Sequence, residues 1–188
     1  MAQKPIRSTL VWQGSSWRFW EHELVGENGR SLLKGSIQHP GAVVLIPLQE
    51  RDGVPEIIML RQYRLALGQT ILELPAGTRG WDEDWLACAQ RELREETGFR
   101  AESFTLLGEF WPTPGLSDEW MRLYLATGLT PDPLPADPDE EIALHPIPLS
   151  EALDMAENGR LQDAKSIIGV WKTWRMVDSG RWPVAGGL

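Results

Sequence analysis

The sequence predicts an α/β or α+β fold, in which short strands alternate with a few helices. One observation is a run of five apolar residues at 42–46, which is typical of a buried strand. Another is an amphipathic helix over residues 84–97, followed by Gly98, which suits a left-handed helix cap. A third is the helical pattern of the last 40 residues, which comes after further strands. Strand, loop and helix therefore follow one another in a single α/β domain.

A small β appendage is expected before this domain, over residues 1–38. Extended pieces at 8–13 and 17–25 and a further run ending at residue 37 are separated by glycine-rich and serine-rich turns. The texture then changes at His39, Pro40 and Gly41. We place the boundary near 38–40, with the main domain over residues 39–188.

The main domain shows further elements in order. Its expected strands cover residues 42–46, 56–61, 71–74, 104–111, 121–125 and 142–147. A polar turn is expected over 49–55, and a proline-rich acidic loop over 131–141. Two C-terminal helices are expected at 150–158 and 163–177, the second with one apolar stripe: Ile167, Ile168, Trp171 and Trp174.

Composition excludes several classes of function. The chain has 188 residues and a formal net charge of −9, which argues against binding to a nucleic-acid backbone. Its longest apolar run is far shorter than the roughly 20 residues of a membrane helix, and no signal-peptide pattern follows Met1, so we expect a cytoplasmic protein. The single cysteine, Cys88, excludes an internal disulfide and is expected to be a small buried hydrophobe.

Three glutamates share one face of the 84–97 helix. Glu92, Glu95 and Glu96 are spaced i, i+3 and i+4, so their like charges repel by roughly 0.2–0.5 kcal/mol a pair. Hard oxygen ligands gathered in this way suit a divalent cation such as magnesium. The alternative is a solvated acidic face, with Arg91 and Arg94 as partial partners.

The spacing around these glutamates decides between the two. It matches all nine fixed positions of the signature G-x5-E-x7-R-E-U-x-E-E-x-G-U, where U is bulky and apolar, through Gly77, Glu83, Arg91, Glu92, Leu93, Glu95, Glu96, Gly98 and Phe99. The chain therefore resembles the Nudix hydrolases. That resemblance implies an α/β/α sandwich around a mixed sheet, with Mg²⁺, or alternatively Mn²⁺, held against a diphosphate.

The resemblance also implies roles for individual residues. Glu92 and Glu96 are the implied metal ligands, and Glu95 is an accessory ligand that is also a candidate catalytic residue, with the carbonyl of Ala76 also available. Arg91 is expected to orient a glutamate. Glu83 is expected to be structural, on the opposite side of the helix from Glu92 if the helical spacing extends back that far.

Two further matches resemble the ADP-ribose pyrophosphatase branch. One is Gln62-Tyr63-Arg64 followed by the segment 72–77, and the other is Pro114, which lies 16 residues after Gly98. The implied reaction splits ADP-ribose or a related ADP-sugar into AMP and a sugar phosphate. Alternatives are a GDP-sugar or dinucleotide hydrolase, an ADP-ribose sensor without catalysis, and a purely structural acidic domain.

Other site residues follow from the same branch. Such enzymes place a catalytic glutamate on an acidic loop, here Glu140 or else Glu141, although this stretch could equally be a solvated linker. Arg64 is the candidate for binding phosphate, because its fork of donors matches phosphate oxygens. Glu119 is a candidate for a ribose hydroxyl or for metal support, or it caps the next strand.

Aromatic residues of the appendage are candidates for stacking on adenine. Trp17, Phe19 and Trp20 lie together there, and similar enzymes exchange this region across a homodimer, so that one subunit completes the pocket of the other. The alternative is that these rings only pack the small sheet or the dimer core. The expected partners are thus a nucleoside diphosphate sugar and a second copy of the chain, with no nucleic acid and no membrane.

Overall fold

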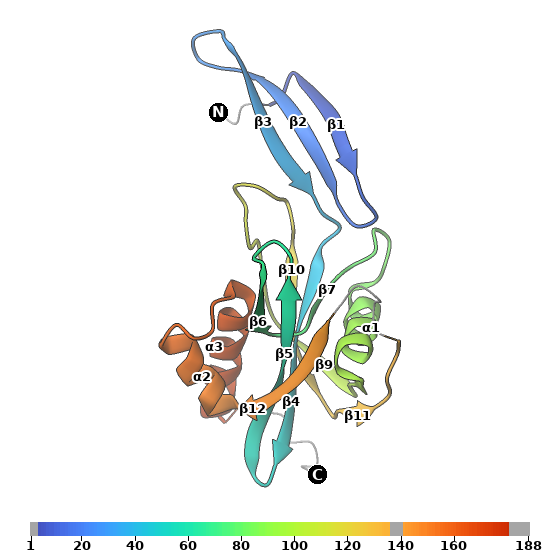
Figure 1. Ribbon diagram of the computed structural model, residues 1–188, viewed down its shortest axis with the longest axis vertical. Coiled ribbons are helices and arrows are strands. Elements are labelled where there is room, and N and C mark those ends of the chain that lie inside the picture. Colours follow the sequence, from blue (N-terminus) through green and yellow to red (C-terminus); the bar gives the residue numbers. More distant parts are fainter. Residues whose placement is uncertain (1–3, 136–140, 181–188) are drawn as a thin grey trace.

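The computed structural model describes residues 4–135 and 141–180. Figure 1 shows a narrow sheet that projects from a larger α/β body. The projecting sheet, called the appendage below, consists of β1 (Arg7–Gln13), β2 (Arg18–Val25) and β3 (Ser31–Gln38). The body contains β4 (Ala42–Arg51), β5 (Val54–Arg64), β6 (Gln69–Glu73), β7 (Ala76–Thr78), α1 (Trp85–Thr97), β8 (Phe99–Arg100), β9 (Ser103–Phe110), β10 (Met121–Thr127), β11 (Thr130–Pro131), β12 (Ile142–Pro148), α2 (Leu149–Glu157) and α3 (Ala164–Asp178).

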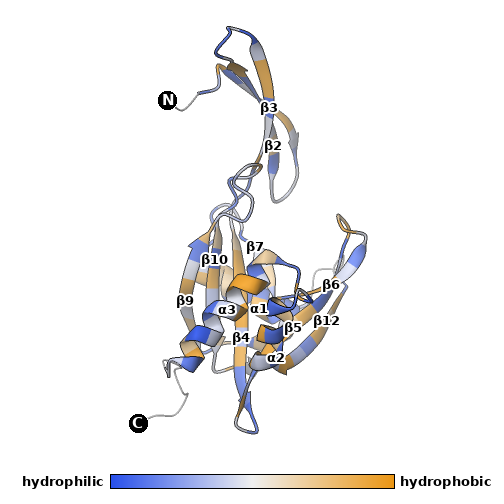
Figure 2. Ribbon diagram, turned by 90° about the vertical axis from the view of Figure 1, so that its left-hand side faces the viewer, coloured by the Kyte–Doolittle hydropathy of each residue, from blue (hydrophilic) through white to orange (hydrophobic). Residues whose placement is uncertain are grey.

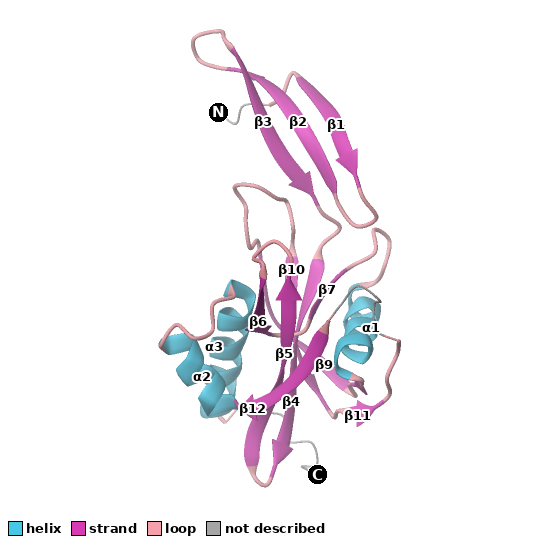
Figure 3. Cartoon of the chain, in the orientation of Figure 1, coloured by secondary structure: helices cyan, strands magenta, loops and turns pink. Residues whose placement is uncertain are grey.

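The body is a three-layer sandwich. Its sheet has the order β12-β5-β4-β10-β9, with β6 paired to β5 and β7 paired to β4. Strands β4 and β10 run parallel, whereas their other pairings within this sheet are antiparallel, so the sheet is mixed. Helix α1 covers one face, and α2 and α3 cover the other (Figure 3). The predicted α/β/α sandwich with a mixed sheet is therefore confirmed.

Strand β4 is buried on both faces. Val44, Ile46 and Leu48 point into the larger core under α2 and α3. Val43 and Leu45 point to the other side, where they pack with Cys88, Ala89 and Leu93 of α1. This explains why residues 42–46 read as an unbroken apolar run, and the burial of Cys88 confirms the expectation for the single cysteine.

Strands β4 and β5 separate after a shared hairpin. Near their turn they pair directly, at 48–51 with 54–57. Further along, β4 pairs with β7, and β5 pairs with β6 instead. The segment between β6 and β7 crosses from one half of the sheet to the other, and the carbonyl of Pro75 accepts a hydrogen bond of 2.8 Å from the N–H of Leu45. This divergence leaves space between the two halves.

The hairpin itself differs from the sequence expectation. A polar turn was expected over 49–55, but β4 continues to Arg51 and β5 begins at Val54. Only Asp52 and Gly53 form the turn, with φ of 54° and 78°. Two successive residues with positive φ are typical of a type I′ turn, which continues both strands to its edge.

The appendage has almost no core of its own. Strand β1 is exposed along its whole length, and β3 is exposed over most of it. Figure 2 shows hydrophobic segments in this projecting sheet as well as in the central strands. The appendage is joined to the body by hydrogen bonds between the backbone of Ile37 and the loop before β10. It also contacts the body through Arg18, whose guanidinium lies 4.3 Å from the ring centre of Trp81.

The C-terminal helices follow the expected pattern with one exception. Ile167, Ile168 and Trp174 pack against the larger core, but Trp171, which was predicted on the same stripe, is 39% exposed. Among the described helices, none has the length and apolar character to cross a membrane.

Candidate active site

Helix α1, which carries the acidic side chains, is capped at both ends. Asp84 Oδ1 accepts hydrogen bonds from the N–H groups of Leu86 (2.9 Å) and Ala87 (3.1 Å). At the other end, Gly98 has a φ of 75° and donates its N–H to the carbonyl of Arg94. These caps set where the helix begins and ends, and so determine which way its glutamates face.

Two of the three glutamates are buried against the backbone of β7. Glu92 and Glu96 are 8% and 6% exposed, and Glu96 Oε2 accepts a hydrogen bond of 2.9 Å from the N–H of Ala76. A methyl group on Gly77 would lie 1.8 Å from Glu92 Cδ, so glycine is required there by this close approach. A solvated acidic face is therefore excluded for these two residues.

Arg91 joins the carboxylates into one network. Its Nη1 donates to Glu92 Oε1 (2.7 Å) and to Glu95 Oε2 (2.8 Å), while its Nε and Nη2 donate to the carboxylate of Glu83 at 2.9 and 3.0 Å. The hydrogen bonds from Arg91 lower the pKa of Glu83 to about 2, against the opposing effect of burial. Arg91 thus holds two of the candidate metal ligands, an arrangement that suits an orienting role.

The condition on which the expected position of Glu83 depended is not met. Glu83 was placed opposite Glu92 by extending the helical spacing backwards, but the helix begins only after Asp84. In the preceding turn, the N–H of Gly80 donates to Glu83 Oε2 at 2.8 Å, and the carboxylate folds back toward Arg91. Glu83 therefore belongs to the same network as the helix glutamates.

The donor set fits a hard divalent cation. Glu96 places a carboxylate oxygen beside the Ala76 backbone, Glu92 packs its carboxylate on Gly77, and Arg91 holds Glu95 next to Glu92. Within the described part of the chain, no three carboxylate, imidazole or thiol side chains are already arranged to hold a metal ion. A cation would instead compete with Arg91 for the oxygens of Glu92 and Glu95.

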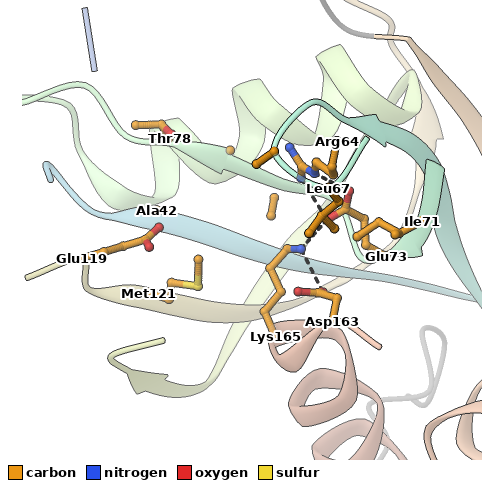
Figure 4. A pocket seen from close by; sticks show the side chains of 13 residues that line it. Ala42, Arg64, Leu67, Ile71, Glu73, Thr78, Glu119, Met121, Asp163 and Lys165 are labelled. Atoms are coloured by element: carbon orange, nitrogen blue, oxygen red, sulfur yellow. Dashed lines mark hydrogen bonds and ion pairs between the residues drawn. The ribbon is translucent and has the colours of Figure 1, made fainter. Parts of the chain in front are cut away.

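A cavity of about 400 Å³ lies where β4 and β5 diverge, and β7 forms part of its wall. Figure 4 shows its walls, which come from β4, the β5–β6 hairpin, β7, the start of β10 and the start of α3. The lining residues are Ala42, Arg64, Ala66, Leu67, Ile71, Glu73, Ala76, Gly77, Thr78, Glu119, Met121, Asp163 and Lys165. The cavity thus brings Arg64 and Glu119 to the strand that contacts the buried glutamates.

Four charged side chains meet at one wall of this cavity. Arg64 donates two hydrogen bonds to the carboxylate of Glu73, from Nε at 2.7 Å and from Nη2 at 2.9 Å. Lys165 Nζ donates to Glu73 Oε2 at 2.5 Å and to Asp163 Oδ2 at 2.9 Å. Glu73 is only 1% exposed and Lys165 7%, so a buried carboxylate holds two cations at the cavity wall.

Sequence reasoning found only Arg64 in this cluster. A signal was present at Glu73, which interrupts an apolar strand between Leu72 and Leu74. A buried acid requires a partner, but nothing in the sequence indicated that it would come from Lys165, 92 residues later. The pairing depends on how α3 packs on the sheet.

Glu119 lies on another part of the cavity wall. Burial raises its pKa, and the charge of Lys165 partly opposes this. Its Oε1 is 3.9 Å from His39 Nδ1, but that nitrogen accepts a hydrogen bond from the N–H of Gly41 and burial lowers the pKa of His39. The histidine is therefore neutral near pH 7, and its contact with Glu119 is not an ion pair.

The remaining described candidates are not among the residues that line the cavity. Trp17 packs on Trp12 with ring centres 4.6 Å apart, and Trp20 Nε1 donates to Gln38 Oε1 at 3.1 Å. Neither lines the cavity within one chain. Glu141 is exposed just before β12, and Glu140 lies outside the described residues.

Comparisons with known proteins agree with this geometry. The NUDIX domain model matches residues 38–168. The chain is 34% identical over 170 residues to a methanol dehydrogenase activator of Bacillus methanolicus, covering 89% of this chain and 90% of that protein. It is 30% identical over 172 residues to an ADP-ribose pyrophosphatase of Bacillus subtilis (strain 168), covering 90% and 91%. The crystal structure of an ADP compounds hydrolase shares the fold, with a TM-score of 0.80, 21% identity and coverage of 97% and 98%.

Proposed function

Because the chain belongs to the Nudix hydrolase family, we propose that it hydrolyses the diphosphate linkage of ADP-ribose or a related ADP-sugar. The products are AMP and a sugar phosphate. The observation that carries this proposal is the position of β7, which has the buried Glu92 and Glu96 against its backbone and also lines the cavity that holds Arg64. Likeness to an ADP-ribose pyrophosphatase over nine tenths of the chain supports the choice of substrate.

The acidic side chains are proposed to hold the metal. Glu92 and Glu96 bind it, with Glu95 and the carbonyl of Ala76 as further ligands, and Mg²⁺ is favoured over Mn²⁺ as the ion. When bound, a divalent cation neutralises diphosphate oxygens and makes a bound water more acidic. Arg91 keeps the carboxylates of Glu92 and Glu95 turned toward one point.

Other side chains are proposed to position the substrate. The guanidinium of Arg64 binds a phosphate, and its ion pair with Glu73 limits the rotamers it can adopt before the substrate arrives. Glu119 accepts a hydrogen bond from a ribose hydroxyl. The base that deprotonates the attacking water comes from the acidic loop, as Glu140 or Glu141.

The appendage is proposed to form a homodimer interface. It exposes several large apolar side chains, among them Leu10, Val11, Trp12 and Leu33, which are between 42% and 62% exposed. Isolated three-stranded sheets need a covered face for stability, and a second copy could supply it. In such a dimer Trp17 and Trp20 would stack on the adenine of a substrate bound in the pocket of the partner subunit.

A substrate panel tests the proposed reaction. Purified protein is incubated with Mg²⁺ and ADP-ribose, ADP-glucose, GDP-mannose or a dinucleotide, and the products are separated by chromatography. We expect AMP and ribose phosphate from ADP-ribose, with a higher kcat/KM than for the other compounds. Faster release of GMP from GDP-mannose would favour the GDP-sugar alternative, and no product from any compound would refute hydrolysis.

Regulation of a partner enzyme is a second candidate, favoured by the likeness to a protein named as an activator. All three helix glutamates are present here, so such regulation could depend on hydrolysis. Adding wild-type protein and a Glu96→Gln variant to a methanol dehydrogenase separates the cases. Equal stimulation by both would indicate a binding role, and no stimulation by either would remove this candidate.

A further inference from the structure

The side-chain amino group of Lys165 has no role in the reaction proposed above. The side chain is 9% exposed, and its Nζ donates to two carboxylates, Glu73 at 2.5 Å and Asp163 at 2.9 Å. An ammonium group has three N–H donors. Within the described part of the chain these two carboxylates are the hydrogen-bond partners of Nζ, so one N–H is left over.

That donor lies at the cavity. Lys165 is among the residues that line it, and Figure 4 shows its amino group between Asp163 and the side chains of Arg64 and Glu73. Glu119 lines the same cavity, and the positive charge of Lys165 lowers its pKa, against the larger effect of burial. The third N–H therefore has access to a bound molecule but little access to bulk water.

Stability alone does not explain the cluster. Removing charges from water costs several kcal/mol per ion, and apolar side chains of similar size are often as stabilising as a buried ion pair. Glu73 already has a bidentate partner in Arg64, so it needs no second cation for its hydrogen bonds. Asp163 balances the charge of Lys165, but neither carboxylate requires this ammonium to lie at the cavity wall, and an anionic ligand in the cavity would explain that position.

We propose that Lys165 binds the diphosphate of the substrate, as a second cation beside Arg64, and that Glu73 and Asp163 hold its amino group in place. This rests on the proposed function, because it assigns a residue to the same site. Arg64 provides a planar fork and Lys165 a compact charge. The wall of the cavity that lacks the metal ligands thus carries the cations for the phosphate oxygens.

Binding of a substrate analogue tests this without turnover. The α,β-methylene analogue of ADP-ribose keeps the charged phosphate oxygens but resists cleavage, and isothermal titration in Mg²⁺ measures its affinity. The variants are Lys165→Met, which removes the charge, and Lys165→Gln, which keeps a neutral donor for Glu73. Lys172→Met is the matched control, because Lys172 lies on the same helix and, among the described residues, its Nζ donates to the carbonyl of Leu107 and to no carboxylate.

We expect both Lys165 variants to bind the analogue roughly 10- to 100-fold more weakly than wild type, the range for one hydrogen bond to a charged group. Lys172→Met should bind within about twofold. Unfolding temperatures show that each variant is folded, as expected since Arg64 still satisfies Glu73. Wild-type affinity in either folded Lys165 variant would overturn the proposal, as would an equal loss in Lys172→Met, which would indicate a general charge effect.

The design separates this proposal from the proposed function. If wild type neither cleaves ADP-ribose nor binds its analogue, the substrate assignment fails. If wild type does both and Lys165→Gln binds equally well, only the role of Lys165 fails. If the role of Lys165 is purely structural, its replacement lowers the unfolding temperature and leaves the affinity of the folded variant for the analogue unchanged.

Discussion

Replacing Gly77 with alanine tests whether Glu92, whose carboxylate packs on Gly77, binds the metal. The new Cβ would lie 1.8 Å from Glu92 Cδ and 2.1 and 2.2 Å from its two carboxylate oxygens. Ordinary contact begins near 3.4 Å, so the carboxylate must move by about 1.6 Å (3.4 − 1.8). Gly77 has no positive φ, so the substitution adds no strain to its own backbone.

A displacement of this size is large for a ligand. Metal–ligand distances tolerate only about 0.2 Å, and a shift near 1 Å can cost about 100-fold in rate. We expect kcat/KM for ADP-ribose to fall by about 100-fold or more, which corresponds to roughly 2.7 kcal/mol of transition-state stabilisation. We also expect the Mg²⁺ concentration for half-maximal activity to rise.

The assay follows AMP release over a range of Mg²⁺ concentrations. The control is Gly108→Ala, whose Cβ would meet only the flexible end of Lys172, at 3.1 Å. If Gly77→Ala keeps kcat/KM within threefold of wild type and needs no more Mg²⁺, Glu92 is not the ligand that the geometry suggests.

Three other predictions concern α1 and its charges. Glu96→Gln should stay folded, with an unfolding temperature within a few degrees of wild type, because it removes little core volume. Its turnover should fall at least 100-fold, because a charge that binds the metal is lost. Near wild-type turnover would show that the metal site is wrongly assigned. Glu83 has its pKa lowered from 4.5 to about 2, so it adds stability above pH 4.5 that is lost as the pH falls toward 2. Urea unfolding should therefore show a smaller loss of stability between pH 4.5 and pH 2 in Glu83→Gln than in wild type, and equal losses would contradict the ion pair with Arg91. Asp84→Ala removes the cap of α1 and should lower the free energy of unfolding by about 1 kcal/mol, measured in urea near pH 7, whereas an unchanged value would mean that the cap does not stabilise the helix.

The sequence predicts much of this fold because its signals are local. The spacing of Leu93 and its apolar neighbours, with a glycine at position 98, is enough to locate α1 to within one residue. The buried strand at 42–46 and the appendage strands are likewise indicated by short patterns. Register and pairing are not local, and so the hairpin at Asp52 and Gly53 was placed too broadly.

Some residues of the candidate site are likewise predicted by a local motif, whereas others come together only when the fold has packed. The glutamates of α1 belong to one motif, and their common face follows from helical geometry. The cluster of Arg64, Glu73 and Lys165 is assembled from β5, β6 and α3, so its contacts exist only after the sheet and its covering helix have packed. Glu83 shows the limit of periodic reasoning, because the helix begins only after Asp84 and helical spacing does not apply to the residue before that cap.

The hydrogen bond from the N–H of Leu74 to Ser166 Oγ offers a way to observe motion at this cavity. It spans 2.7 Å and is buried, and Ser166 is itself held by Asp163 at the start of α3. The Leu74 amide can exchange its hydrogen with solvent only when α3 lifts from the sheet or the whole protein unfolds. Exchange at this single amide, with and without nucleotide, would therefore measure how tightly a bound ligand keeps the C-terminal helix closed over the sheet.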